Sequence, residues 1–389
     1  MGDVEYGMQT FVKCTVWHHL LEAVGFSRQG PMVGCFDGPT NFRYRLAPGT
    51  IKESLFSCLG NRRTYLDAAL HAAFFAACAA TVVLPKVPIA LIRTIFALDA
   101  WFVVSDFQQW MASVGHTYMH MLFPACFALA DGTLPGMQAL MIIQWVSSGV
   151  GKVGPWFSNV NGPFMIQSPW MRGTRWFHRL LFKSSENLAP TRGAALFASF
   201  AAWVEWFCPL LLCASALPCC VGPRADLAVG LGIAGLLAMH VYIVWMPAPF
   251  DVFQWNTYFA ITCVYLFWYA SWGLDGPGLL AMHPLLVLYL CVELCVVVAG
   301  HFLPDYISFY VTHRYWAGNW AQAYFLVRKG AEGKLAGLRS FGSPAWDPLP
   351  AAMKARADPM TMQYGAAKGL GYMWLATYNM KIFPAVYRR

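Results

Sequence analysis

The chain has 389 residues, of which 58% are hydrophobic, 16% aromatic and only 12% charged, and its formal net charge is +8. Soluble domains carry about 25% charged residues, so this composition excludes an ordinary soluble globular protein. Several apolar runs reach the roughly 20 residues that span a bilayer. We therefore expect an integral, multi-pass membrane protein that contacts membrane lipids. Its positive charge is expected to reflect orientation and lipid contact, and no nucleic-acid partner is expected.

The N-terminal segment, residues 1–64, has a mixed composition. Its stretch at residues 11–25, FVKCTVWHHLLEAVG, has a helical pattern but contains a lysine, two histidines and a glutamate. Such a stretch predicts either an interfacial helix or a short span buried in protein. Residues 31–58 are rich in glycine and proline and predict a loop.

Residues 65–301 form the predicted transmembrane domain of an all-α fold. Apolar runs separated by proline, glycine and aspartate predict about eight transmembrane helices. They lie near residues 66–84, 87–105, 107–130, 134–152, 193–216, 226–247, 253–273 and 278–301. The boundary at 105–107 is weak, and one continuous helix there would lower the count by one. A span at 11–25 would raise it to about nine.

The distribution of lysine and arginine favours the eight-helix arrangement. The basic excess falls in residues 1–64, in 152–192 and after residue 302. Eight spans place four before and four after the middle segment, so all three lie on one face, which the positive-inside tendency assigns to the cytoplasm-like side. Residues 153–192 are expected to be a Trp/Asn-rich loop at the membrane edge. Residues 302–389 are expected to be an amphipathic tail on the membrane surface.

The third predicted span carries a stripe of polar residues. Asp106, Gln109, Ser113, His116 and His120 follow one another at spacings of three and four, which predicts one helix face turned into the protein. The two histidines at i and i+4 can bind one metal ion or line a proton path. Three interpretations stay open: a hydrogen-bonded structural stripe, the wall of a polar cavity, and metal or haem ligands. Because no third or fourth ligand is identifiable, the sequence predicts no metal site.

Other ionisable residues lie within or at the ends of predicted spans. Glu205 lies between two tryptophans in the middle of one span, where a carboxylate must be paired, protonated or functional. Lys152 follows a run of small residues, and Gly149 in this run permits close approach of another backbone. The lysine either extends to the membrane surface or is held in an apolar pocket, where its neutral amine can act as a base. His240 near the end of another span can face the same interior.

The stretch SSGVGKVGPWF at residues 147–157 resembles a motif of the vitamin K-dependent gamma-carboxylase superfamily, also called the HTTM superfamily. In the carboxylases, the motif lysine is regarded as the base that deprotonates reduced vitamin K. The resemblance places Lys152 on that lysine, Gly149 on the preceding glycine, and Trp156 near the family tryptophan. Lipase maturation factors share a related pattern, so the motif alone does not specify a reaction. The large soluble C-terminal domain of the carboxylases has no counterpart here, so protein carboxylation is not expected.

A closer resemblance is to a family of uncharacterised actinobacterial transmembrane proteins, and it covers roughly residues 11–338. The most specific match is FLPDYISFYVTHRYWAGNW at residues 302–320, which includes Arg314 and Asn319. This resemblance implies a fold and no established activity.

Two main functional hypotheses follow. The first is an enzyme acting on a quinol or a lipid, with Lys152 as base and with Glu205 and His240 as further catalytic residues. Its expected substrate-binding residues are His116, His120, Trp156, Asn256, Arg314 and Asn319. The alternative is a non-catalytic subunit or assembly factor of a larger bioenergetic or pigment-binding membrane complex, with other membrane subunits as partners. Either hypothesis leaves the cofactor unknown and suggests a quinone, lipid or pigment as ligand. A transporter is a weaker third hypothesis, because no inverted repeat is visible.

Overall fold

The computed structural model shows a bundle of helices, and no β-strand occurs among the residues it describes. The described residues are 2–24, 42–50, 52, 54, 56–106, 115–127, 132–154, 157–158, 161–162, 165, 174–183, 190–220, 222–245, 253–303 and 312–313. Some predictions lie outside them, namely those for Gln109, Ser113, Trp156, Arg314, Asn319, most of the loop at 153–192 and the surface tail.

Each predicted span overlaps a described helix, although α7 covers only part of 107–130 and α15 begins six residues after the predicted start at 278. They are α1 (Gly2–Ala23), α3 (Phe42–Leu46), α4 (Tyr65–Val83), α5 (Ile89–Ser105), α7 (Gly115–Ala125), α8 (Thr133–Gly151), α10 (Arg175–Leu181), α11 (Arg192–Leu211), α12 (Pro223–Trp245), α13 (Phe253–Val264), α14 (Gly276–Leu280) and α15 (Pro284–Phe302). A 3₁₀ turn, Ser57–Leu59, precedes α4, and another, Leu212–Ala216, extends α11. A π-helical turn, Tyr265–Tyr269, extends α13. The predicted all-α class is confirmed for the described residues.

Local sequence sets where helices begin. Thr64 caps α4 through a capping box, because its hydroxyl accepts from the Asp67 amide while the Asp67 carboxylate accepts from the Thr64 amide. Pro284 begins α15 at a position where a missing amide hydrogen costs nothing. Both signals are visible in the sequence, but the predicted spans did not use them, and the span predicted from residue 278 began six residues before α15 does.

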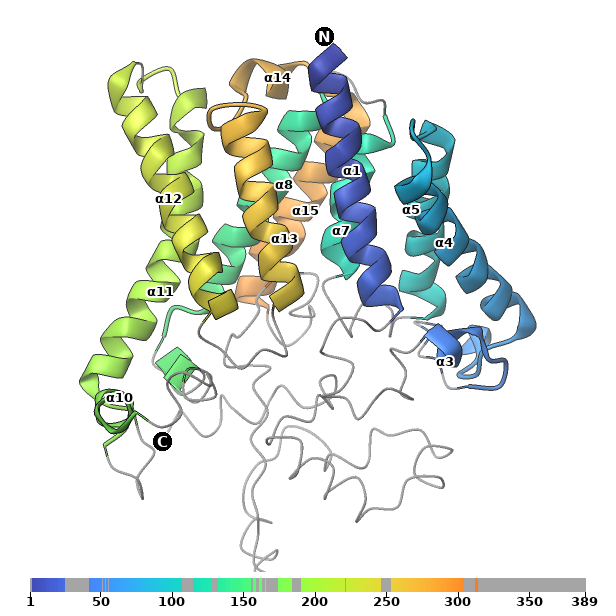
Figure 1. Cartoon of the computed structure of the whole chain (residues 1–389), viewed down its shortest axis with the longest axis horizontal. Helices are drawn as coiled ribbons and strands as arrows, with labels where there is room; N and C mark the ends of the chain where they lie inside the picture. Colours follow the sequence, from blue (N-terminus) through green and yellow to red (C-terminus); the bar gives the residue numbers. More distant parts are fainter. Residues whose placement is uncertain are drawn as a thin grey trace, which may run out of the picture.

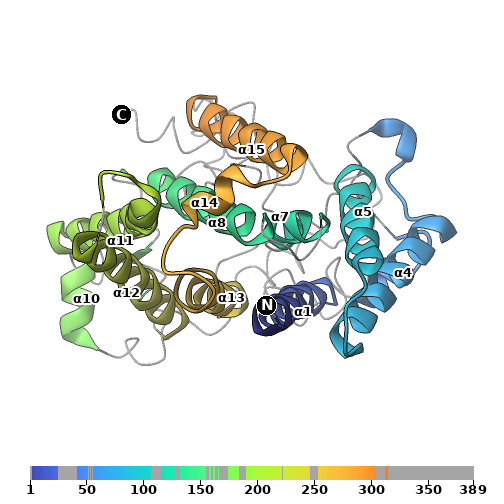
Figure 2. The ribbon, with the colours of Figure 1, turned by 90° about the horizontal axis from the view of Figure 1, so that it is seen from above.

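Helix α8 lies at the centre of the bundle. Seen from above, α15 runs along one side of α8, while α11, α12 and α13 lie around its other side (Figure 2). Helix α7 continues the central row, and α1, α4 and α5 complete the far end of the molecule (Figures 1 and 2). Side chains of α8 therefore meet partners from both halves of the bundle.

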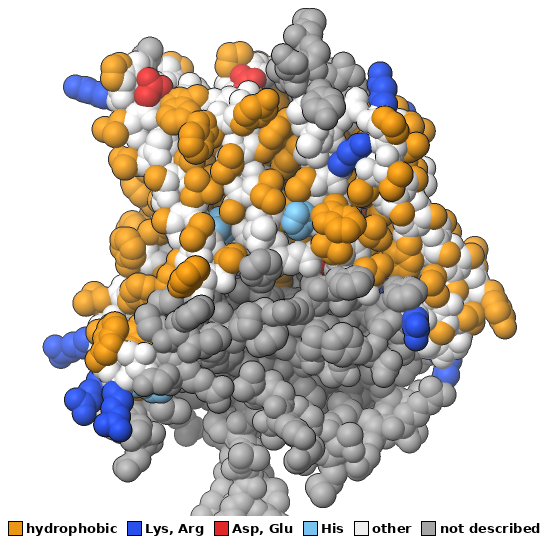
Figure 3. Space-filling view, viewed as in Figure 1, with side chains coloured by type: hydrophobic (Ala, Val, Ile, Leu, Met, Phe, Trp, Pro, Cys, Tyr) orange, Lys and Arg blue, Asp and Glu red, His pale blue; other side chains and the backbone are white. Residues whose placement is uncertain are grey.

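Four described helical segments are long and apolar enough to cross a membrane: Tyr65–Val83, Arg192–Ala216, Pro223–Trp245 and Pro284–Phe302. The outward face of α11 shows the expected pattern, since Leu196, Phe200, Trp203 and Phe207 are all exposed at helical spacing. Hydrophobic side chains cover much of the visible helical surface, and most charged ones lie toward its two ends (Figure 3). The integral membrane class follows from these features. The count of about eight spans stays a prediction.

Two short basic helices share one end of the bundle. Helices α3 and α10 and the C-terminal end of α15 lie at this end, and the N-terminus of α1 lies at the other (Figure 1). Helix α1 packs against α4, α7 and α13, and Phe11, Val12 and Val16 are almost fully buried. The first helix is therefore part of the bundle, and its passage through the bilayer stays a prediction.

Candidate functional site

Two polar clusters lie on opposite sides of α8. Two consecutive serines of α8, Ser147 and Ser148, each contact one of these sides. The Ser148 hydroxyl donates to Glu205 Oε1 on α11 at 2.8 Å. The Ser147 hydroxyl lies 2.9 Å from His301 Nε2 on α15 and donates to the backbone carbonyl of Thr312. Successive helix residues point about 100° apart, so adjacent serines can serve two different neighbours.

The first cluster, called here the lysine cluster, consists of Lys152, Glu205 and Ser148. Lys152 is the C-cap residue of α8, and its Nζ donates to Glu205 Oε2. Both side chains are buried, with Lys152 6% and Glu205 7% exposed. The Lys152 ammonium also lies 5.8 Å from the centre of the Phe157 ring. The lysine therefore points into the protein, and the interpretation as a surface-reaching lysine does not fit the structure.

Gly149 makes this pairing geometrically feasible. A Cβ added at Gly149 would lie 2.5 Å from the Trp206 backbone nitrogen and 2.8 Å from the Glu205 carbonyl carbon. Real Cβ contacts are never so short, so α8 and α11 approach this closely only with glycine here. The predicted role of Gly149 in close backbone approach is confirmed, and it brings the Glu205 carboxylate within reach of Lys152.

His240 lies beside the lysine cluster in a fully hydrogen-bonded setting. The Trp145 indole on α8 donates to His240 Nε2 at 3.0 Å, and His240 Nδ1 lies 2.8 Å from Asn256 Oδ1 on α13. An indole nitrogen can only donate, so Nε2 accepts and Nδ1 carries the proton that is donated to Asn256. This arrangement holds a neutral imidazole with both nitrogens engaged, and the Lys152 charge acts on it electrostatically. His240 and Asn256 are thus brought together, while the catalytic and substrate-binding roles predicted for them stay predictions.

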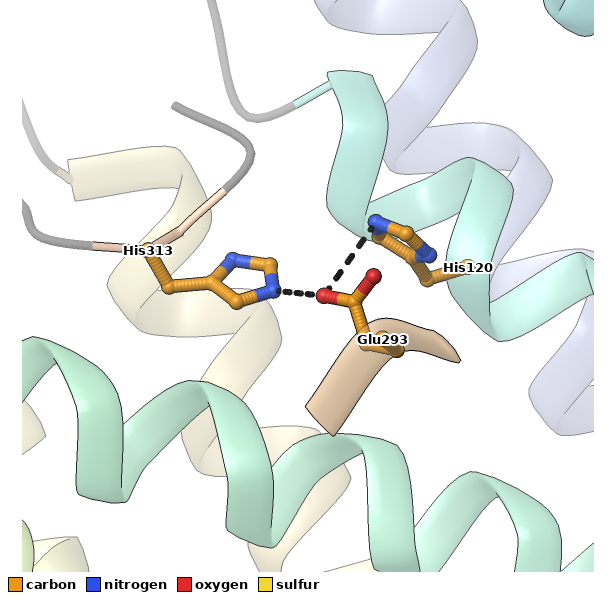
Figure 4. Close-up of side chains that lie close together, drawn as sticks. All are labelled: His120, Glu293 and His313. Atoms are coloured by element: carbon orange, nitrogen blue, oxygen red, sulfur yellow. Dashed lines mark hydrogen bonds and ion pairs between the residues drawn. The ribbon is translucent and has the colours of Figure 1, made fainter. Parts of the chain in front are cut away.

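The second cluster, called here the histidine cluster, consists of His116, His120, Glu293 and His313. Glu293 Oε1 lies 2.7 Å from His313 Nε2 and 3.8 Å from His120 Nε2 (Figure 4). His116 stacks on His313 with ring centroids 5.2 Å apart. All four side chains are buried. The prediction that His116 and His120 share one helix face is confirmed. Their partners are Glu293 on α15 and His313 in the segment 312–313, and no described contact joins this cluster to Lys152.

The predicted stripe does not begin where the sequence suggested. Asp106 is the C-cap of α5 with φ −150° and ψ 69°, so it does not share a helix face with His116. It accepts instead from Arg63 Nε at 2.8 Å, and its carboxylate lies 3.0 Å from His71 Nε2. The i, i+3 spacing was misleading because Asp106 lies at the end of α5, whereas His116 lies in α7. The inclusion of Asp106 in the stripe was therefore wrong.

Some residues of these clusters were not predicted. His313, Tyr289 and Glu293 were not among the site residues predicted from the sequence. A signal for His313 was present, because it immediately precedes Arg314 within the most specific stretch of the family resemblance. No local pattern links Tyr289 to His120, since their contact joins residues 169 positions apart.

Comparison with known proteins agrees with the membrane assignment. A family described as transmembrane protein of unknown function, DUF3556, matches residues 7–368. No curated protein and no solved structure matches the chain. The expected membership in an uncharacterised transmembrane family is confirmed, and no likeness to the gamma-carboxylase superfamily or to lipase maturation factors emerges. The chain belongs to the DUF3556 family of transmembrane proteins.

Proposed function

We propose that this protein is a multi-pass membrane enzyme that takes a proton from a weakly acidic, lipid-soluble substrate such as a quinol. The observation that carries the proposal is the buried ion pair between Lys152 and Glu205 at the end of α8. Ionisable groups inside a membrane protein are costly and mark proton or substrate pathways more often than surface ones do. The motif resemblance around Lys152 is additional support from the sequence.

The pair offers a route to a neutral amine. In a poorly solvated site, the ammonium proton of Lys152 can move to the Glu205 carboxylate, which leaves a neutral amine beside a carboxylic acid. The amine can then accept a proton from a substrate hydroxyl, forming an ammonium and a substrate anion. The Ser148 hydroxyl holds the other carboxylate oxygen, so Glu205 Oε2 stays directed at the lysine. Lys152 is the base in this scheme, and Glu205 is its proton-accepting partner.

His240 has a positioning role in this proposal. Its two hydrogen bonds connect α8 through Trp145 with α13 through Asn256. A base must lie within hydrogen-bond reach of the proton it removes, and these two bonds keep α8, which carries Lys152 at its end, in register with α12 and α13. We therefore assign His240 a positioning role instead of the predicted catalytic one.

The test uses the full-length protein in detergent and a reduced short-chain quinol as the probe. The absorbance difference between quinol and quinolate reports proton transfer directly. We expect a quinolate signal with the unmodified protein and loss of that signal in Lys152→Ala, because the variant has no amine that can accept the quinol proton and pair with the anion. Glu205→Gln is expected to reduce the signal as well, since the amide cannot accept the lysine proton.

Lys52→Ala is the matched control. Lys52 forms a different buried pair, with Asp67 at 2.8 Å, at the start of α4. Lys52→Ala also removes one buried ion pair, as Lys152→Ala does, but it should leave the quinolate signal intact. An equal signal in Lys152→Ala, or no signal in the folded unmodified protein, would contradict the proposal. Isolation of the protein in a stoichiometric complex whose function survives Lys152→Ala would favour the non-catalytic subunit instead.

A further inference from the structure

The histidine cluster gathers metal-binding side chains from three separate segments. His120 comes from α7, Glu293 from α15 and His313 from the short described segment at 312–313, and their side chains point toward one another (Figure 4). One ligand atom from each lies within 4.8 Å of the other two, and all three residues are buried. This is a convergence that no local sequence motif predicts.

The distances suit a single small ion. With metal–ligand bonds of about 2.0–2.2 Å, two donors on one tetrahedral ion lie roughly 3.4 Å apart. Glu293 Oε1 lies 2.7 Å from His313 Nε2 and 3.8 Å from His120 Nε2, which brackets that separation. Small side-chain rotations would bring all three donors to bonding distance. Two imidazole nitrogens and one carboxylate oxygen form a ligand set used by zinc and by non-haem iron.

The surroundings of His120 support ligation through Nε2. Its Nδ1 contacts the hydroxyl of Tyr289, which lies one turn before Glu293 on α15. Metal-binding histidines commonly donate their second ring N–H to an oxygen, which fixes the tautomer and the ring orientation. With the proton on Nδ1, the lone pair of Nε2 is directed toward Glu293. His116, one turn before His120, is the nearest further imidazole, with its ring centroid 6.0 Å from that of His120.

The backbone at His313 is held in an unusual conformation. His313 has φ 51°, in the left-handed region that non-glycine residues rarely adopt. The preceding residue is fixed by Ser147, whose hydroxyl donates to the Thr312 carbonyl. It is also packed against Gly300, where an added Cβ would lie 2.0 Å from Thr312 Cγ2. Backbone strain of this kind is concentrated at functional and ligand sites. The contacts at Thr312 therefore secure His313 beside Glu293.

We propose that His120, Glu293 and His313 bind one divalent transition-metal ion, Zn²⁺ or Fe²⁺, with His116 as the nearest additional nitrogen ligand. The site has two nitrogens and one oxygen and leaves coordination positions open for water or a substrate. A buried carboxylate in a membrane protein requires a positive partner, and a metal ion satisfies Glu293 together with both imidazoles. The proposal is independent of the lysine cluster.

The test measures metal in the full-length protein purified in detergent without chelators. Elemental analysis should find about one Zn or Fe per chain. After chelator treatment, Zn²⁺ and Fe²⁺ are added back separately, and Co²⁺ serves as an absorbance probe of the ligand set. The ion that the protein retains identifies the metal, and retention of Zn²⁺ or of Fe²⁺ supports the proposed metal site. Glu293→Gln and His313→Gln should bind Co²⁺ at least about tenfold more weakly, and Tyr289→Phe should weaken binding to a smaller degree.

His19→Gln is the matched control. His19 Nε2 lies 2.7 Å from Asp99 Oδ2, so this variant also removes a buried histidine from a carboxylate, at a place outside the cluster. It should bind Co²⁺ as the unmodified protein does. Folding of each variant is checked by circular dichroism, and Tyr289→Phe remains informative if the ligand variants do not fold. Absence of binding by the folded unmodified protein, or equal binding by folded Glu293→Gln or Tyr289→Phe, would overturn the proposal.

Discussion

Asp106 provides a negative charge for the buried basic side chains of Arg45 and Arg63, at the end of α5. Burial raises the pKa of the Asp106 carboxyl, but the hydrogen bond to His71 and the positive charge of Arg63 outweigh it and leave the pKa below its usual value. Burial also lowers the pKa of the nearby Arg45 guanidinium to about 10, with Asp106 acting in the opposite direction. Arg45 therefore remains charged at neutral pH. The pair Arg63–Asp106 is buried on both sides, with side chains 0% and 1% exposed.

We predict that Asp106→Asn strongly destabilises the protein. Removing one partner of a buried pair leaves an uncompensated charge and costs about 3–5 kcal/mol. Because the folded pKa of Asp106 is lowered, its contribution is present above the unfolded pKa of ~3.9 and is lost as pH falls through the folded value. Thermal unfolding of the detergent-solubilised protein, followed by tryptophan fluorescence from neutral to acidic pH, checks both expectations.

An exposed aspartate provides the comparison. Asp226 lies in the first turn of α12 and is exposed, so Asp226→Asn should change stability by less than about 1 kcal/mol. Stability of Asp106→Asn should also depend less on acidic pH than that of the unmodified protein. Equal unfolding temperatures for the two variants would contradict the role assigned to Asp106.

Helices α8 and α11 show how an element can depend on one small residue. Gly149 is the point where α8 meets the backbone of α11, and the same contact sets the position of Glu205. Elsewhere on α8, Gln138 donates to the carbonyls of Leu266 and Gly273 at 2.6 and 2.9 Å. A single side chain thus satisfies backbone groups near the π-helical turn that extends α13. Gly149 therefore sets how closely α8 packs on α11, and Gln138 sets how α8 is hydrogen-bonded to the segment after α13.

Gly149→Ala is predicted to cost about 1–3 kcal/mol, because the new methyl group would collide with the α11 backbone. Gly230→Ala on α12 is the matched control. Its added Cβ would lie 3.6 Å from the Trp272 ring, which is an ordinary contact. Alanine there should be neutral or slightly stabilising, since glycine disfavours a helix interior. Unfolding temperatures measured in one detergent provide the comparison, and similar values for both variants would show that the helices can separate without cost.

At the scale of the whole molecule, the arrangement of helices agrees with the charge distribution. The described segments with basic residues, α3 and α10, lie at the same end of the bundle as the end of α15 (Figure 1). Between α3 and the end of α11, the helices α4, α5, α7, α8 and α11 alternate in direction. This alternation separates α5 from α7 and favours the eight-helix prediction over one continuous helix there.

Cysteine labelling can test this topology. Cys58 lies between α3 and α4, and Cys219 lies between α11 and α12; both are exposed. In single-cysteine variants in sealed, oriented vesicles, a membrane-impermeant maleimide should label them from opposite sides. The reason is that five of the predicted spans, which overlap α4, α5, α7, α8 and α11, lie between the two cysteines. Labelling from the same side would support a continuous span near residue 106 and contradict the eight-helix arrangement.

The sequence by itself determined the membrane class and most helix positions. Length of apolar run and helix-breaking residues are local properties, so they place α4, α5, α8, α11 and α12 within a few residues. The same local information predicted that His116 and His120 share a face and that Gly149 allows close approach.

Only the tertiary structure decided which polar groups meet. Lys152 and Glu205 are 53 residues apart, Trp145 and His240 are 95 apart, and Glu293 and His313 come from different segments. Such pairings depend on which helix faces are turned toward each other, and helix packing sets this through shape across the whole bundle. For that reason the predicted residues separate into a lysine cluster and a histidine cluster on the two sides of α8.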